Sequence, residues 1–211
     1  MVMTMNFGFR TRRGSEPPLK IVLVRPGATD FDEEGRILGR LDVPLNARGI
    51  SQADEVARGV QPLPIRAVYS APELSSSQTS DIIGKQLSIP PRIVQSLQNL
   101  NHGLWQGRCI EDVKNCQSKV YRLWQEQPEN VCLPEGEMIA EARSRAREAF
   151  DRITKKHDTD AIVIVLQEPL ASIFRAVACQ ADLGDLWAAQ RLQGTWELLD
   201  LELAPVNVKA R

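Results

Sequence analysis

The chain has 211 residues, of which 43% are hydrophobic and 25% are charged, a composition that excludes disordered, collagen-like and coiled-coil proteins. The 26 basic and 27 acidic residues leave a formal net charge of −1, which argues against a nucleic acid or an anionic membrane as a partner. Histidine occurs only twice, at His102 and His157, which limits the chemistry that a histidine-dependent site can perform.

Residues 1–18 are expected to form a mobile tail ahead of one α/β domain at 19–205. The arginines of this tail follow a short, weakly apolar start, which is the reverse of the order in an export signal. A solvated arm is the simpler interpretation. The alternative is an arm that contacts an acidic partner through Arg10, Arg12 and Arg13.

The first half of the domain begins with a strand that is buried on both faces. Residues 20–25 are a continuous apolar, β-branched run, as in a central parallel strand. The polar segment 28–47 is longer than a plain connection, and loops of this kind are usually functional. A helix is predicted at 46–58, capped by Asn46, with an apolar stripe of Ile50, Ala53, Val56 and Ala57. A strand at 66–70 and a helix at 75–87 follow.

The second half continues the alternation of strands and helices. A strand is predicted at 93–97, a helix at 110–127, a second helix at 137–156, the strongest strand at 161–166, a helix at 169–181 and a last strand at 195–202. Strands that alternate with helices predict a mostly parallel sheet with helices on both faces.

The cysteines and the apolar runs limit the compartment and the cofactors. The four cysteines have no CxxC spacing, so neither a zinc site nor another metal site is expected, and we expect no cofactor. The longest apolar runs are far below the roughly 18 residues that cross a bilayer, so no membrane association is expected. Four free thiols without an export signal indicate the cytoplasm.

Several motifs occur at the ends of the predicted strands and in the loops. They are Leu23-Val-Arg-Pro-Gly-Ala-Thr29, Gly39-Arg-Leu-Asp-Val-Pro-Leu-Asn-Ala-Arg-Gly49 with Gln52-Ala53, Tyr69-Ser-Ala-Pro72 with Gln78-Thr79, Gly103-Leu-Trp-Gln-Gly107, and Pro134-Glu-Gly-Glu137 with Arg145. In this order, over about residues 20–181, they resemble the blocks of the histidine phosphatase superfamily, the phosphoglycerate mutase-like proteins. The resemblance implies a three-layer α/β/α sandwich with a mostly parallel central sheet.

The resemblance also implies phosphoryl transfer through a phosphohistidine. In such chemistry a neutral imidazole attacks phosphorus, arginines and a second histidine hold the phosphate oxygens, and a carboxyl group protonates the leaving oxygen. Here Arg25 keeps the first arginine, and Gly27 follows as in the motif. The nucleophilic histidine, however, corresponds to Pro26, which has no lone pair to offer.

The other catalytic positions also carry different residues. The second arginine corresponds to Ser75, and the acid corresponds to Asn99. The second histidine corresponds to Gln167 or Glu168, depending on the register after residue 166. Loss of a covalent nucleophile alone costs about a millionfold in turnover. We therefore assign no catalytic residue in this family pattern.

These substitutions lead to the hypothesis of a catalytically inactive family member with a binding, regulatory or structural role. Its partner would be an unidentified protein or a small anionic ligand, and the resemblance also allows a homodimer. The remaining pocket is expected to contain Arg25, Pro26, Gly27, Ser75, Asn99, His102, Gln167 and Glu168.

Two alternatives stay open. The first is an active phosphatase or phosphomutase with rearranged catalytic residues, in which His102, just before Gly103, is the candidate for a displaced nucleophile. His157 precedes the strand at 161–166 and is therefore expected at the opposite end of the sheet. The second alternative is a small-molecule sensor that uses the pocket around Arg25.

Overall fold

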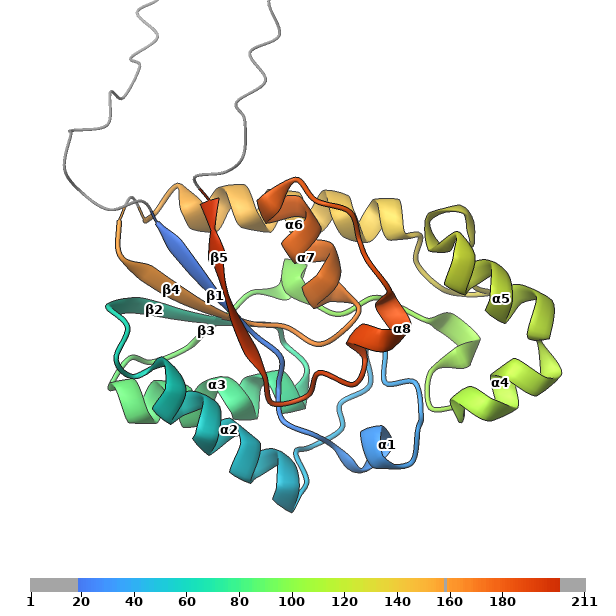
Figure 1. Cartoon of the computed structure of the whole chain (residues 1–211), viewed down its shortest axis with the longest axis horizontal. Helices are drawn as coiled ribbons and strands as arrows, with labels where there is room; N and C mark the ends of the chain where they lie inside the picture. The colour runs from blue at the N-terminus through green and yellow to red at the C-terminus, as the bar shows by residue number, and fades with distance from the viewer. Residues whose placement is uncertain (1–18, 158, 202–211) are drawn as a thin grey trace, which may run out of the picture.

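The computed structural model describes residues 19–157 and 159–201. The tail predicted at 1–18, with its three arginines, and the end of the predicted domain at 202–205 lie outside these described residues. In the described part, one five-stranded sheet lies between two layers of helices (Figure 1). The predicted α/β fold with a mostly parallel sheet is therefore confirmed.

The sheet has the strand order β3-β2-β4-β1-β5. Its strands are β1 (Lys20–Val24), β2 (Ile65–Ser70), β3 (Arg92–Ile93), β4 (Ala161–Val165) and β5 (Trp196–Asp200). The first four are parallel, whereas β5 runs antiparallel to β1. Val24 at the end of β1 and Ser70 at the end of β2 both pair with Val165. The carboxyl ends of the three central strands therefore meet at one edge.

Each face of the sheet buries one half of the alternating side chains. Ile21 and Leu23 of β1 pack into the core beneath α6 (Ile139–Thr154) and α7 (Leu170–Cys179). Val22 and Val24 pack against α2 (Ala47–Val60) and α3 (Leu74–Leu87). Figure 1 shows these two helix pairs on opposite sides of the sheet. A continuous apolar run such as β1 is stable because both of its faces are covered.

The remaining helices gather beyond the carboxyl edge of the sheet (Figure 1). They are α1 (Asp30–Glu33), α4 (Ile110–Cys116), α5 (Ser118–Glu126) and α8 (Leu186–Ala189). Short 3₁₀ turns occur at Gln95–Leu97, Gly103–Trp105 and Pro128–Asn130. No helix in the described part of the chain has the length and apolar character to cross a membrane.

Three predicted elements differ in the structure. The strand predicted at 93–97 is only the two-residue β3, because it pairs with the last two residues of β2 alone. The helix predicted at 110–127 is divided at Gln117, where φ is −130° and the side chain accepts a hydrogen bond from Trp105 Nε1 (2.8 Å). The loop predicted at 28–47 contains α1, which Thr29 caps together with Asp32.

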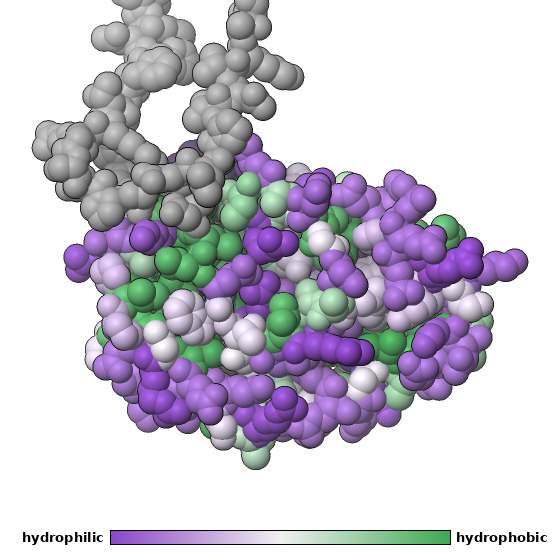
Figure 2. Space-filling model, viewed as in Figure 1, coloured by the Kyte–Doolittle hydropathy of each residue, from purple (hydrophilic) through white to green (hydrophobic). Residues whose placement is uncertain are grey.

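The surface also departs from one prediction. Ile50, which the sequence predicts on the buried stripe of α2, is 48% exposed, because the buried face of this helix consists of Gly49, Ala53, Val56, Ala57 and Val60. Figure 2 shows mostly hydrophilic side chains along the lower part of the molecule, over α2 and α1. Apolar surface appears near β5, whose Trp196 and Leu198 are exposed.

The central strand predicts a large difference between two isoleucine substitutions. Ile164 of β4 is fully buried, whereas Ile93 of β3 is 46% exposed. We expect Ile164→Ala to lower the free energy of unfolding by about 2–5 kcal/mol, because it leaves a cavity in the core. The matched Ile93→Ala change should cost about 0.5 kcal/mol or less. Urea denaturation followed by circular dichroism measures both, and similar costs would contradict the assigned core.

Candidate active site

Three loops that follow the central strands meet at the carboxyl edge of the sheet. The strand pairing continues one residue past each end, since Leu166 N donates to Val24 O (2.9 Å) and Ala71 N donates to Val165 O (3.0 Å). Arg25 and Gln167 are the next residues of two of these loops. In open α/β sheets this edge is where ligands bind.

The loop after β1 is held by side chains from α2 and α3. Gly27 N donates to Thr79 Oγ1 (3.2 Å), and Ala28 N donates to Gln52 Oε1 (2.9 Å). A Cβ atom at Gly27 would lie 2.1 Å from the carbonyl oxygen of Gly49, so the two backbones approach too closely for any other residue. Gly27, Gln52 and Thr79, which belong to the sequence motifs, thus stabilise the conformation of this loop.

Arg25 is buried and forms ion pairs with two carboxylates. Its Nε donates to Glu168 Oε1 (2.9 Å), and its Nη1 donates to Glu197 Oε1 of β5 (2.5 Å). Burial acts to lower the pKa of Arg25, but the charges and hydrogen bonds of Glu168 and Glu197 outweigh it and raise the pKa above its usual value. Arg25 is therefore a permanent cation that already has anionic partners.

Glu168 also contacts the start of α7. Its second carboxylate oxygen, Oε2, accepts a hydrogen bond from Ser172 N (3.1 Å). Pro169, the N-cap of α7, supplies no capping side chain, so Glu168 provides the negative charge at this helix terminus. One carboxylate thus binds both Arg25 and a free N–H group of the first turn.

Three neutral side chains take the place of the charged catalytic set. Gln167 Nε2 donates to Ser75 Oγ (2.6 Å), and Asn99 Nδ2 lies 3.3 Å from Gln167 Oε1. Asn99 Nδ2 also donates to the backbone carbonyl of Glu168 (2.9 Å). The two residues left open by the sequence register therefore have separate roles: Gln167 contacts Ser75, and Glu168 contacts Arg25.

A charged cluster behind these side chains holds the Asn99 backbone. Glu137 lies between Arg40 (2.8 Å) and Arg145 (2.7 Å), and both arginines donate to the Asn99 carbonyl oxygen. Burial acts to raise the pKa of Glu137, but these two arginines lower it overall. Glu73, whose pKa burial raises, accepts from Asn99 N (2.6 Å). The cluster fixes the loop that carries Asn99 and His102.

The two histidines lie in different surroundings. His102 is 1% exposed and packs 5.6 Å from the Trp124 ring, and neither of its ring nitrogens has a hydrogen-bond partner among the described residues. Burial lowers the pKa of His102 to about 4. The Leu100 backbone, which lies near the ring without a hydrogen bond of normal geometry, and the Glu137 charge act in the opposite direction. The imidazole is therefore neutral at pH 7. His157, by contrast, lies 2.9 Å from the Tyr69 hydroxyl.

A cavity of about 810 Å³ joins most of the candidate residues. Seven of the eight line it, namely Arg25, Pro26, Gly27, Ser75, His102, Gln167 and Glu168. Asn99 is fully buried and is not part of the lining, because its amide faces the backbone and Gln167. The sequence-based residue set is thus largely one contiguous surface.

Charges of both signs line this cavity in equal number. The cationic side chains are Arg25, Arg36, Arg48, Lys114 and Arg191, and the anionic ones are Asp32, Glu34, Glu111, Asp112 and Glu168. Among the described residues, no carboxylate lies within ion-pair distance of Arg48 or Arg191. An anionic ligand therefore gains little from the lining as a whole and must make local contacts with single cations.

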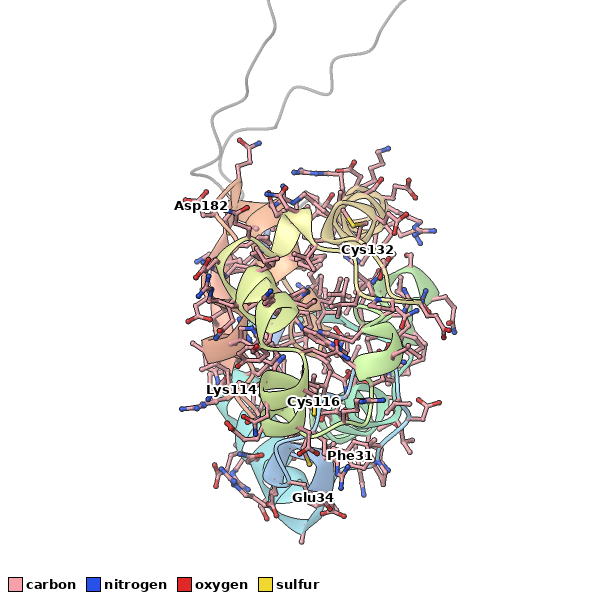
Figure 3. All side chains as sticks on the ribbon, turned by 90° about the vertical axis from the view of Figure 1, so that its right-hand side faces the viewer. Phe31, Glu34, Lys114, Cys116, Cys132 and Asp182 are labelled. Carbon is pink, nitrogen blue, oxygen red and sulfur yellow. The ribbon has the colours of Figure 1, made fainter. Side chains whose placement is uncertain are left out.

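Helices α1 and α4 both contribute residues to the cavity lining. Ile110 N donates to Gly35 O (2.8 Å), which joins the end of α1 to the start of α4. Figure 3 shows Phe31 and Glu34 toward the same end of the molecule as Lys114 and Cys116 of α4, with Cys132 and Asp182 toward the other end. Both Glu34 and Lys114 belong to the cavity lining.

Sequence reasoning missed the aromatic part of the lining. Tyr121 of α5 and Trp187 of α8 both line the cavity, with ring centroids 4.9 Å apart. Trp187 Nε1 is buried without a hydrogen-bond partner among the described residues. The sequence shows only that two aromatic residues lie near the starts of helices. It does not show that both side chains face the same cavity.

Comparisons with known proteins agree with this geometry. The sequence profile described as the histidine phosphatase superfamily (branch 1) matches residues 21–207. Phosphoserine phosphatase 1 of Hydrogenobacter thermophilus is 24% identical over 185 residues, which cover 87% of this chain and 87% of the relative. The adenosylcobalamin/alpha-ribazole phosphatase of Salmonella typhimurium is 22% identical over 183 residues, or 87% of this chain and 91% of the relative.

A solved structure shows the same fold. YhfR of Bacillus stearothermophilus superimposes with a TM-score of 0.78 at 20% identity, over 86% of this chain and 91% of that one. At this identity the likeness concerns the fold alone, and it agrees with the mostly parallel sheet and its two helix layers.

The hypothesis of a catalytically inactive member with a binding, regulatory or structural role is contradicted by these comparisons. Both relatives are named as phosphatases, not as inactive proteins, and they favour the alternative of an active enzyme with rearranged residues. The hypothesis relied on the residues that the family motif lost at Pro26, Ser75 and Asn99.

Because the family profile spans most of the chain, and the sheet and the motif residues that support its loops agree with it, this protein belongs to branch 1 of the histidine phosphatase superfamily.

Proposed function

We propose that this protein is a phosphatase that hydrolyses small phosphate monoesters with a rearranged set of catalytic residues. The observation that carries the proposal is the neutral, unpartnered imidazole of His102 in the lining that also contains Arg25. The phosphatase names of two relatives support this class of reaction. A cavity of about 810 Å³ has the size of a small-molecule site.

In this proposal His102 is the phosphoryl acceptor. A lone pair of its ring forms an N–P bond while the ester P–O bond breaks, and the leaving oxygen keeps that electron pair and takes a proton from water. A second water then attacks phosphorus, which releases phosphate and restores the neutral ring. Arg25 offsets the charge of the transferred group. Burial lowers the pKa of His102 to about 4, so the ring is unprotonated at neutral pH and carries a lone pair that can attack.

Access to His102 requires local movement. Both of its ring nitrogens are covered by protein atoms, and Trp124, which packs beside the ring, is 2% exposed. A phosphate group reaches the ring only when these neighbouring side chains shift. We therefore expect slow turnover, limited by this opening rather than by encounter with the substrate.

We place the reaction in the cytoplasm, with a small phosphorylated metabolite as the anionic ligand and no nucleic acid or membrane partner. All four cysteines are free, and Cys116 and Cys132 are exposed. Exposed free thiols are typical of reducing compartments. Fractionation of cells that express the tagged chain tests this placement.

The catalytic roles predict the effects of three substitutions. His102→Ala should abolish phosphate release from 4-nitrophenyl phosphate and O-phosphoserine, and Arg25→Ala should lower it by about 10²–10³-fold, as for the loss of one charge-stabilising donor. His157→Ala is the matched control and should retain activity within about twofold.

After incubation with a phosphodonor, mass spectrometry at alkaline pH should find an acid-labile adduct of about 80 Da, one PO₃ unit, on the His102 peptide. A wild-type chain without turnover, or unchanged activity of His102→Ala, contradicts the proposal.

The burial of His102 predicts how stability depends on pH. Its pKa is about 4 in the folded chain and has the ordinary value of 6.5 once unfolded, so between these values only the unfolded chain takes up the proton. The stability that His102 contributes is therefore complete above pH 6.5 and is lost as the pH falls toward 4, by about 3 kcal/mol in total.

Urea unfolding at pH 7 and pH 4.5 measures this loss. In His102→Phe, which cannot titrate, the pH dependence should be smaller than in the wild type by about 2–3 kcal/mol. An equal change in the free energy of unfolding between pH 7 and pH 4.5 for the two proteins would show that His102 is not buried in its neutral form.

A further inference from the structure

We propose that the Glu168 carboxylate is an internal competitor of the substrate phosphate, an autoinhibitory ligand that must leave Arg25 before a phosphate group can bind there. This inference rests on the proposed function in one respect only, namely that a phosphate enters the cavity beside Arg25. It concerns how the site is controlled, not which residue attacks phosphorus.

The contacts of Glu168 are those that a bound phosphate would make. One carboxylate oxygen accepts from Arg25 Nε (2.9 Å), and the other accepts from Ser172 N in the first turn of α7 (3.1 Å). A guanidinium and a helix-terminal N–H group are typical partners of phosphate oxygens. The carboxylate therefore occupies a built anion site rather than an arbitrary position in the cavity.

Charge makes the two occupants exclude each other. Arg25 already has Glu197 on its Nη1, so Glu168 is the second anion on one guanidinium. A phosphate dianion beside both carboxylates would face like charges in a part of the protein where Arg25 is 6% exposed and screening is weak. Phosphate binding at Arg25 therefore requires that Glu168 withdraw.

The surroundings of Glu168 permit the side chain to move while its backbone stays. Asn99 Nδ2 holds the Glu168 carbonyl oxygen (2.9 Å), and the same asparagine accepts a hydrogen bond from Leu170 N (3.3 Å). The carboxylate, by contrast, has only Arg25 and Ser172 N as partners among residues 19–157 and 159–201, and Glu168 lines the cavity. Rotation of the Glu168 side chain, with its backbone fixed, is the movement that we propose exposes the anion site.

The experiment measures binding of inorganic phosphate to the full chain by isothermal titration calorimetry at pH 7.5. We expect Glu168→Ala, which removes both the charge and the volume, to bind phosphate at least tenfold more tightly than the wild type. Glu168→Gln, which removes the charge but keeps the volume, should show a smaller gain. The control is Glu55→Ala, which removes an exposed carboxylate of α2 that does not line the cavity and should change the affinity less than twofold.

A double variant identifies the cation that binds the phosphate. In Glu168→Ala/Arg25→Ala the gain in affinity should disappear. Persistence of the gain would assign the phosphate to another cation of the lining, such as Arg48 or Arg191, and would overturn the proposal. Equal affinities of the wild type and Glu168→Ala, with a cooperative melting transition in both, would also overturn it. If Glu168→Ala does not fold, the same comparison with Glu168→Gln decides.

This test is independent of catalysis. Tight, Arg25-dependent phosphate binding by Glu168→Ala without any turnover would refute the proposed phosphatase and leave the autoinhibitory contact intact. Turnover that depends on His102, together with unchanged phosphate affinity in Glu168→Ala, would support the enzyme and refute the autoinhibitory contact.

Discussion

A buried guanidinium must keep anionic partners, and this requirement at Arg25 organises both the fold and the site. Its partners Glu168 and Glu197 lie 143 and 172 residues away in the sequence. The ion pairs therefore join the end of β1 to the turn after β4 and to the antiparallel strand β5. Removing one partner of a buried ion pair lowers the free energy of unfolding far more than the intact pair raises it, because the remaining charge is left without compensation. The contacts that join these strand ends are thus also the contacts that neutralise Arg25 in the cavity.

The substitutions at the other catalytic positions fit together as a set. Ser75, Gln167 and Asn99 are neutral, and they hydrogen-bond to one another or to nearby backbone groups. Because buried polar groups need partners, each of these side chains depends on the others. The result is a site with little excess charge of either sign around one engaged arginine. Any phosphate chemistry in this protein must begin from that balanced state.

His102 connects this balanced site to the proposed reaction. Its ring is one of the few buried polar groups of the described chain without a hydrogen-bond partner, and burial keeps it neutral. An unpartnered buried group costs stability, and such a cost is often found where a protein binds a ligand or performs chemistry. The charged cluster of Arg40, Glu137 and Arg145 holds the loop on which this histidine lies. The charged cluster therefore fixes the position of the His102 loop, whereas burial of the ring sets its protonation state.

The sequence by itself determined the buried strands, the alternation of strands and helices, and the loops that meet at one edge. Continuous β-branched runs such as β1 and β4 are stable only when both faces are covered, and the motif glycine, glutamine and threonine positions carry local backbone requirements. Only the tertiary structure decided the division of the 110–127 helix at Gln117, the two-residue length of β3 and the separate partners of Gln167 and Glu168. It alone brought Tyr121 and Trp187 into the same cavity as His102. These features depend on contacts between residues far apart in the chain, and local propensity and periodicity carry no information about such contacts.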